Sequence, residues 1–86
     1  MPTSSSFSRP VIIESSSPGR LQAIGGVREA AEILLREWPL AGRGPRYLAA
    51  LEFCHEALAG EVEIEEARHA FVEAAKEAGT FVREGR

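Results

Sequence analysis

The chain has 86 residues with 44% hydrophobic and 27% charged side chains, and its formal net charge is −3 at pH 7. These values indicate one small globular domain and exclude an intrinsically disordered chain, while the acidic balance argues against nucleic-acid binding. The lone cysteine, Cys54, excludes an internal disulfide and suits a reducing compartment.

The first residues differ in composition from the rest of the chain. Residues 1–6 are rich in serine and lack the basic and apolar segments of a signal peptide, and no apolar run in the sequence is long enough to cross a membrane. We therefore expect a disordered tail at residues 1–6, a single domain over residues 7–84 and a cytoplasmic location.

Two short β-prone stretches come next. Residues 7–14 predict a strand, and the proline within them, Pro10, favours an edge position because it donates no hydrogen bond to a ladder. A Ser-Pro-Gly cluster at residues 15–19 predicts a turn, and residues 20–24 predict the second strand of a hairpin. The first strand has its apolar side chains of one parity at Phe7, Val11 and Ile13.

Three helical patterns follow the hairpin. The first covers residues 27–38 and ends at Pro39, which cannot continue the backbone ladder. The second covers residues 45–59 and begins with Pro45 at the favoured first helical position. The third covers residues 63–78, and the glutamates in its first turn suit the helix dipole. The expected apolar stripe of the first helix comprises Val27, Ala30, Ala31, Leu34, Leu35 and Trp38.

A last β-prone segment closes the chain. Residues 80–83 predict a short strand that most simply joins the hairpin. The predicted fold is therefore α+β, with the order β-β-α-α-α-β. A small antiparallel sheet, made of the hairpin and the C-terminal strand, packs against three helices.

The order of several short motifs resembles one protein family. The motifs are Phe7…Pro10-Val11, Trp38-Pro39, Gly44-x-x-Tyr47, Cys54-x-x-Ala57-Leu58-x-Gly60, Ala67-Arg68-x-Ala70-Phe71 and Ala75-x-Glu77-Ala78-Gly79. Over residues 7–83 the chain resembles the small bacterial proteins of the DUF982 family, a domain of unknown function. The resemblance implies a short α+β domain with no known activity, and it carries over no catalytic residues.

The strongest candidate for a ligand site lies at the start of the second helix. The backbone N–H groups there favour an anion, and two arginines could hold a phosphate or carboxylate by paired hydrogen bonds. In the alternative interpretation, the nearby aromatic rings pack in the core and the arginines pair with Glu32, Glu37 or Glu52. The candidate anion-binding residues are Arg43, Gly44, Arg46, Tyr47 and Trp38.

The remaining reactive side chains favour structural interpretations. Cys54 lies on an apolar stripe, and His55 points about 100° away from it on a helix, so the two do not form a catalytic pair. His69 follows Glu66 at a spacing found in di-iron proteins, but those proteins need two copies of the motif. Arg68 is expected to cover apolar surface or to pair with a nearby glutamate. We therefore expect no catalytic residues, no metal site and no cofactor.

These observations favour a non-enzymatic cytoplasmic module for protein interaction or regulation, because the chain is small, lacks a catalytic constellation and leaves sheet edges open. The alternative is a small anion- or metabolite-binding protein that uses the N-terminus of the second helix with Arg43 and Arg46. An unidentified protein and a small anion are thus the partners considered. Nucleic acid and membrane are not expected, and the sequence leaves the oligomeric state open.

Overall fold

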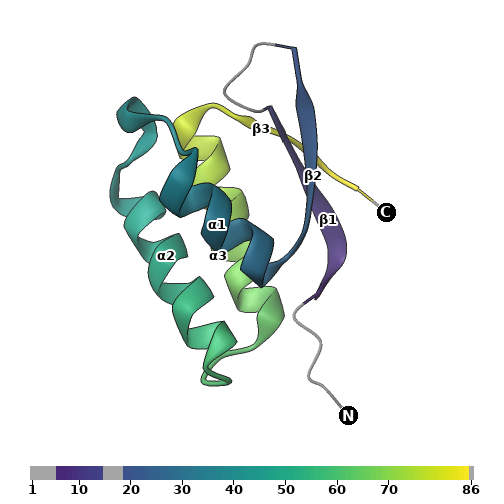
Figure 1. Cartoon of the computed structure of the whole chain (residues 1–86), viewed down its shortest axis with the longest axis vertical. Coiled ribbons are helices and arrows are strands. Elements are labelled where there is room, and N and C mark those ends of the chain that lie inside the picture. Colours follow the sequence, from purple (N-terminus) through teal and green to yellow (C-terminus); the bar gives the residue numbers. More distant parts are fainter. Residues whose placement is uncertain (1–5, 15–18, 86) are drawn as a thin grey trace.

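The computed structural model describes residues 6–14 and 19–85, and its helices and strands follow the predicted order (Figure 1). Three strands form one antiparallel sheet and three α-helices accompany it, so the predicted α+β class is confirmed. A short 3-10 helix, η1, connects the first two helices. The elements are β1 (Ser6–Glu14), β2 (Leu21–Gly26), α1 (Val27–Arg36), η1 (Leu40–Gly42), α2 (Pro45–Leu58), α3 (Ile64–Ala78) and β3 (Phe81–Glu84).

The helices cover one face of the sheet (Figure 1). α1 packs on β2 and α3 packs on β1, while α2 packs on both of these helices from the side away from the sheet. The molecule therefore has three layers, and α2 forms the outermost helical layer. The core lies between the layers, and its largest fully buried side chains are Phe71, Ile24, Leu34, Val11, Val27 and Cys54.

β1 is the central strand, so the predicted edge position is wrong. The strand order is β2-β1-β3. Pro10 is tolerated because the pairing of β1 with β2 is regular only from Val11 to Glu14 and shifts register between Ser6 and Val11. Pro10 lies in that irregular stretch, and its carbonyl accepts the Gly85 amide at 2.7 Å just beyond the end of β3. A proline here excludes regular pairing at one position without excluding a central place for its strand.

α1 departs from the predicted apolar stripe at one position. Leu35 is 65% exposed, whereas Ile33, which was outside the predicted stripe, is only 7% exposed. α1 follows β2 without a loop and packs on both β2 and α2. Its buried surface therefore extends toward the sheet, where Ile33 shares a cavity wall with Ile13 and Gln22. Leu35 consequently points away from the sheet into solvent.

The ends of α2 and α3 follow the sequence signals. α2 begins at Pro45, directly after Gly44. At the start of α3, the Glu66 side chain accepts the Glu63 amide at 3.4 Å, which pairs a helix-end donor that would otherwise lack a partner. α3 ends at Gly79, whose φ of 75° lies in the left-handed region that glycine adopts most easily.

Two sequence predictions fall mostly outside the described residues. Of the tail predicted at residues 1–6, only Ser6 is described, and it is the first residue of β1. Of the turn predicted at residues 15–19, only Gly19 is described. Within the described ranges, no helix has both the length and the apolar content that crossing a bilayer requires.

Candidate functional site

The segment between α1 and α2 places both predicted aromatic residues in the core. Trp38 is 3% exposed, and its Nε1–H donates to the Gly42 carbonyl at 3.2 Å. Tyr47 is 7% exposed, and its hydroxyl donates to the Leu34 carbonyl at 2.9 Å. The two ring centroids lie 6.3 Å apart. Packing and a hydrogen bond therefore hold each ring, and neither ring is displayed to solvent.

The N-terminus of α2 is occupied by an anion that the chain itself supplies. The Tyr47 amide donates to Oε1 of Glu77 at 3.2 Å, and the Arg46 amide donates to Oε2 at 3.4 Å. Glu77 lies in the last turn of α3, where a negative charge opposes the dipole of α3 but favours the dipole of α2. Gly44 permits this approach, because a Cβ there would lie 2.8 Å from Oε2 of Glu77. An external anion would have to displace this carboxylate.

The two predicted arginines have different surroundings. Arg43 donates from Nη2 to the Trp38 carbonyl at 3.0 Å, and its guanidinium carbon lies 5.4 Å from the centroid of the Tyr47 ring. Arg43 therefore braces the connecting segment. Arg46 is exposed and lines a cavity of about 250 Å³ between α2 and α3, beside Phe53 and His69. The structure thus separates side chains that the sequence analysis grouped, and ligand binding by them stays a prediction.

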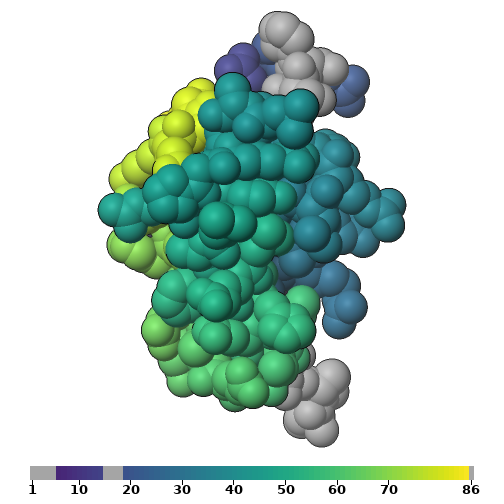
Figure 2. Space-filling model, turned by 90° about the vertical axis from the view of Figure 1, so that its left-hand side faces the viewer, coloured from purple at the N-terminus to yellow at the C-terminus, as the bar shows by residue number. Residues whose placement is uncertain are grey.

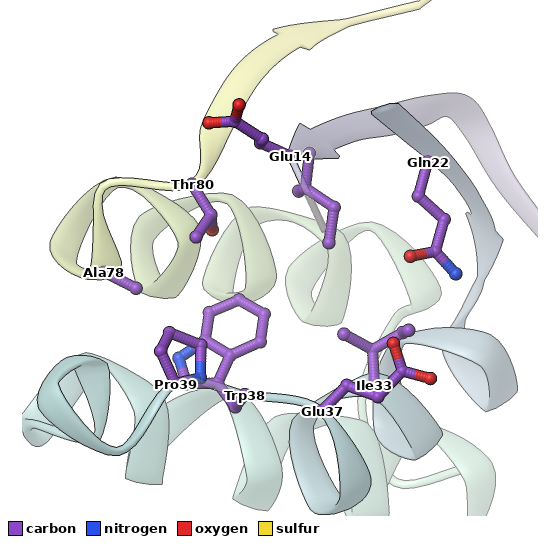
Figure 3. Close-up of a pocket in the computed structure, with 9 residues that line it drawn as sticks. Glu14, Gln22, Ile33, Glu37, Trp38, Pro39, Ala78 and Thr80 are labelled. Carbon is purple, nitrogen blue, oxygen red and sulfur yellow. The ribbon is translucent and has the colours of Figure 1, made fainter. Parts of the chain in front are cut away.

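A second cavity, of about 240 Å³, opens beside Trp38, and we name it the Trp38 cavity (Figure 3). Its apolar wall comprises Ile13 of β1, Ile33 of α1, the Trp38 ring with Pro39, and Ala78 at the end of α3. Figure 3 shows the six-membered ring of Trp38 directed into the space between these elements. The cavity therefore lies where the ends of the sheet, α1 and α3 meet.

Four polar residues complete the lining of the cavity: Glu14, Gln22, Glu37 and Thr80. Two backbone hydrogen bonds hold Glu14 and Thr80 in place at this wall of the cavity. Thr80 donates its amide to the Ala75 carbonyl at 2.9 Å, and Glu14 donates its amide to the Thr80 carbonyl at 2.8 Å. The end of β1 is thereby joined to the turn before β3. In Figure 3 Thr80 lies across from Trp38, whereas the Glu14 carboxylate is directed away from the cavity.

The Trp38 cavity is acidic. Glu14 and Glu37 line it, and no lysine or arginine among the described residues does. An adjoining groove shares Gln22, Ile33 and Glu37 with the cavity. This groove adds two more carboxylates and one arginine, which belong to Glu29, Glu32 and Arg36. Negative charge therefore predominates along this side of the molecule.

Sequence reasoning missed the Trp38 cavity. The sequence analysis considered Glu37 only as a possible partner for the arginines, and it did not consider the other polar residues that line the cavity. Their positions, from Glu14 to Thr80, share no spacing that marks a common site. One local signal was present, the acidic residue directly before Trp38 at the end of a helix, but it does not identify the other walls.

The reactive side chains named from the sequence are not brought together. Cys54 is 1% exposed, and burial raises the pKa of its thiol to about 12, so the nucleophilic thiolate is disfavoured at neutral pH. His55 and His69 are exposed on different helices. Within residues 6–14 and 19–85, no group of three or more potential metal ligands forms.

Arg68 joins three elements of the fold. Its Nε donates to Glu65 at 2.7 Å, and its Nη1 pairs with Glu84 of β3. The Glu65 carboxylate also accepts the amide and the hydroxyl of Ser8 on β1, at 2.9 and 2.8 Å. Burial acts to raise the pKa of Glu65, but the hydrogen bonds from Ser8 and Arg68 outweigh it and hold this pKa below its usual range. The side chain of Arg68 is therefore held by ion pairs that join α3 to the sheet.

Comparison with known proteins identifies the family of the chain. The family model described as "Protein of unknown function (DUF982)" matches residues 9–82. The NMR structure of the Agrobacterium tumefaciens protein Atu1219, a structural-genomics target, is similar with a TM-score of 0.76 and 33% sequence identity, over 100% of this chain and 90% of that chain. No curated protein matches. A family match over nearly the whole chain, together with the same fold, shows that this protein belongs to the DUF982 family.

Proposed function

We propose that the chain is a non-enzymatic cytoplasmic protein-interaction module and that it binds its partner through the outer face of α1, η1 and α2. One observation carries the proposal: most of the large apolar side chains that the described residues expose come from this stretch. They are Leu35 (65% exposed), Leu40 (82%), Leu48 (62%) and Leu58 (43%).

The arrangement of α2 suits a docking surface. α2 is the helical layer farthest from the sheet, and Figure 2 views the molecule from this side, with α2 across the middle and α1 at the right. Leu48 and Leu58 lie at i and i+10 on one side of the helix, with the half-buried Leu51 between them at i+3. Exposed His55 lies on this side at i+7. An amphipathic helix with an apolar stripe of its own fits such a surface.

The magnitude of the apolar effect supports a binding role. Full burial of one leucine side chain contributes about 1.5–3 kcal/mol, whereas association costs about 4–15 kcal/mol, so a partner has to cover all four of these leucines and add polar contacts around them to reach measurable affinity. Within this stretch, Leu48 and Leu51 line one shallow hollow on α2 together with Pro45 and Ala49, and exposed apolar surface of this kind often marks a place where another molecule binds.

The test compares matched leucine substitutions in an affinity experiment. The chain is immobilised, incubated with a bacterial extract, and the bound proteins are quantified by mass spectrometry and then purified for calorimetry. Leu35→Gln with Leu48→Gln should abolish binding of a specific partner. Leu21→Gln, which changes a leucine that is 59% exposed on β2, should leave it intact. A partner lost equally with both variants, or with neither, would rule out this face.

A second candidate function is the binding of a small anion at the start of α2 with Arg43 and Arg46. The supporting observation is that Arg46 has no hydrogen bond or ion pair from its side chain within the described residues, although it lines a cavity. The Glu77 carboxylate on the α2 amides weighs against the backbone part of this site. Phosphate titration of the parent chain, followed through the Arg46 and Tyr47 amide signals, tests it; unchanged signals would exclude it.

A further inference from the structure

The outer edge of β2 carries backbone groups that the described chain leaves free. β2 is an outer strand, because the strand order is β2-β1-β3. Glu14 of β1 donates its amide to the Thr80 carbonyl beside β3, so its partner across the other ladder, Leu21, turns its N–H and C=O away from β1. Ala23 has the same orientation two residues later. Among the described residues, no hydrogen bond reaches the backbone groups of Leu21 or Ala23.

The side chain of Glu29 shows that α1 flanks this edge. Its Oε1 accepts the Gly25 amide at 2.9 Å, and this amide also points away from β1 because Gly25 follows Ala23 by two positions. Glu29 thereby closes one end of the edge and leaves Leu21 and Ala23 as its open part. A groove of about 240 Å³ lies beside it, between residues 22–24 of β2 and one side of α1.

The α1 side of this groove is acidic. Glu29, Glu32 and Glu37 line it, and Arg36 is the one basic residue of the described chain that does so. Glu32 and Glu37 form no hydrogen bond or ion pair within residues 6–14 and 19–85, and Glu29 uses one of its two oxygens. Excess negative charge therefore lies beside open backbone groups, so a strand with positive side chains complements both.

An added strand would place its side chains in two different surroundings, since successive side chains of a strand point to opposite faces. Figure 3 shows the Gln22 side chain directed toward α1, so side chains opposite Gln22 lie on the side of the acidic groove. Side chains opposite Leu21 and Ala23 lie on the face of the sheet that no helix covers, where Leu21 is 59% exposed. The partner that fits this edge therefore alternates basic and apolar residues.

The outer edge of β3 is less suited to strand addition. β3 has four residues, its pairing with β1 shifts register, and it carries Arg83 and Glu84. Glu84 is also held in an ion pair with Arg68. Charges and irregular pairing of this kind protect sheet edges from added strands, as prolines do. β2 has six residues without a charge or a proline, so its edge lacks these protections.

We propose that the outer edge of β2 binds an extended peptide segment of alternating basic and apolar residues, as an added antiparallel strand. Two apolar residues of the segment exchange backbone hydrogen bonds with Leu21 and Ala23, and its basic residues lie against Glu29 and Glu32. A second copy of the chain fits less well, because pairing of two β2 edges brings the same carboxylates of both copies together. The inference goes beyond the proposed function, since this edge and groove include none of the exposed leucines of α1, η1 and α2.

A synthetic peptide with the sequence KVKVK, acetylated and amidated, tests the proposal on the full chain. In antiparallel pairing its valines lie opposite Leu21 and Ala23, and its lysines lie on the side of the groove. We expect a dissociation constant on the order of millimolar and saturable shifts of the Leu21 and Ala23 amide signals. With peptide at ten times the dissociation constant, hydrogen exchange of these two amides should slow about tenfold, because about one chain in eleven stays free.

Modified peptides separate backbone pairing from charge attraction. N-methylation of both valines removes the amide donors that face β2, so it should abolish the protection of Leu21 and Ala23. N-methylation of the central lysine removes a donor that faces away from β2, so it should leave that protection in place. The peptide EVEVE has the same alternation with the opposite charge and should not bind.

Variants of the chain complete the test. Ala23→Pro removes an amide that the described sheet does not use, so the chain should fold and lose KVKVK binding. Glu32→Gln should weaken binding about two- to fivefold, the range for one exposed charge pair. Glu52→Gln, at an exposed position of α2 outside the groove, should leave it unchanged. Leu35→Gln with Leu48→Gln should also leave it unchanged, which separates this proposal from the proposed function.

Three results would overturn the proposal. In the first, the peptide with N-methylated valines, or EVEVE, binds as tightly as KVKVK. In the second, KVKVK shifts only signals outside β2 and the groove. In the third, the Leu21 and Ala23 amides are already protected in a parent chain that sediments as a dimer, and Ala23→Pro yields monomers. The edge would then belong to a second copy of the chain.

Discussion

The start of α2 and the Trp38 cavity both place charged groups beside Trp38, yet they satisfy those charges in opposite ways. At the start of α2, Glu77 accepts the amides of Arg46 and Tyr47, and Arg43 donates to the Trp38 carbonyl. The charged groups of Glu77 and Arg43 therefore both have partners within the fold, whereas the Arg46 guanidinium has none among the described residues. In the Trp38 cavity, the Glu37 carboxylate lies beside an apolar wall, and no basic residue of the described chain lines the cavity.

This difference teaches how to weigh a charged motif in a small domain. A helix N-terminus attracts an anion, but the anion can be a side chain from a distant part of the same chain. An arginine next to such a helix start can likewise brace the fold, as Arg43 does with the Trp38 carbonyl and the Tyr47 ring. A charged motif therefore indicates an external ligand only after its partners within the fold have been counted.

The largest expected effect comes from breaking the contact that links the two regions. Gly42→Ala should destabilise the protein by about 1–3 kcal/mol, because an added Cβ would lie 2.5 Å from Cβ of Ala78 and 3.0 Å from its Cα. Relief of this clash requires η1 to move away from α3, which would also stretch the bond from Trp38 to the Gly42 carbonyl. Urea unfolding and the Trp38 indole signal measure both effects.

A compensating change distinguishes this clash from a general effect of alanine. Ala78→Gly alone should cost about 0.5–1 kcal/mol in α3. Combined with Gly42→Ala, it should recover about 1 kcal/mol relative to the sum of the single variants, since it removes the nearer of the two contacts. Simple additivity would show that the close approach of η1 and α3 is not the cause.

Local periodicity predicted most of the fold, and tertiary context explains the misses. The strand parity of Phe7, Val11 and Ile13 agrees with their burial, because one face of a sheet was covered. The exposure of Leu35 could not be predicted from the helical pattern, since the pattern does not say that α1 buries Ile33 against the sheet. The central place of β1 depended on an irregular pairing that no local rule reveals.

The candidate site was less predictable than the fold. The boundary at Gly44 and Pro45 followed from known helix-start preferences, and α2 does begin there. Its occupant, Glu77, lies 30 positions from Tyr47 in the sequence, on another helix. The Trp38 cavity needs β1, β2, α1 and α3 to be docked before it exists. Such sites arise from packing between elements, so spacing within one element carries little information about them.

An intermediate effect should follow when the start of α2 loses its internal anion. Glu77→Ala should destabilise the protein by about 0.5–2 kcal/mol, the range for losing a helix cap, because the Arg46 and Tyr47 amides lose their acceptor. The vacated N-terminus of α2 should then hold backbone amides without an acceptor, which can donate to an external anion. Added phosphate is expected to shift the Arg46 and Tyr47 amide signals in this variant more than in the parent chain.

Glu73→Ala is the matched control for that experiment. It removes a glutamate one turn earlier on α3 that pairs with Lys76 at 3.7 Å, and it leaves the α2 amides bonded to Glu77. The control should therefore show no gain in phosphate response. An equal response in both variants would mean that the lost negative charge, and not the vacated helix end, attracts the phosphate.

The smallest expected effect concerns pH and a third, fully paired cluster. The pKa of Glu65 is held below its usual range, so the Ser8–Glu65–Arg68 cluster contributes stability above the ordinary glutamate pKa of about 4.3, and this contribution is lost as the pH falls through the lowered value. Urea midpoints measured from pH 7 to pH 3 should therefore fall less steeply below about pH 4.3 in Glu65→Gln than in the parent chain. The difference should be small, because the Glu65 side chain is 46% exposed and solvent screens its interactions. Parallel curves would show that the bonds from Ser8 and Arg68 do not distinguish the charged from the neutral carboxyl group.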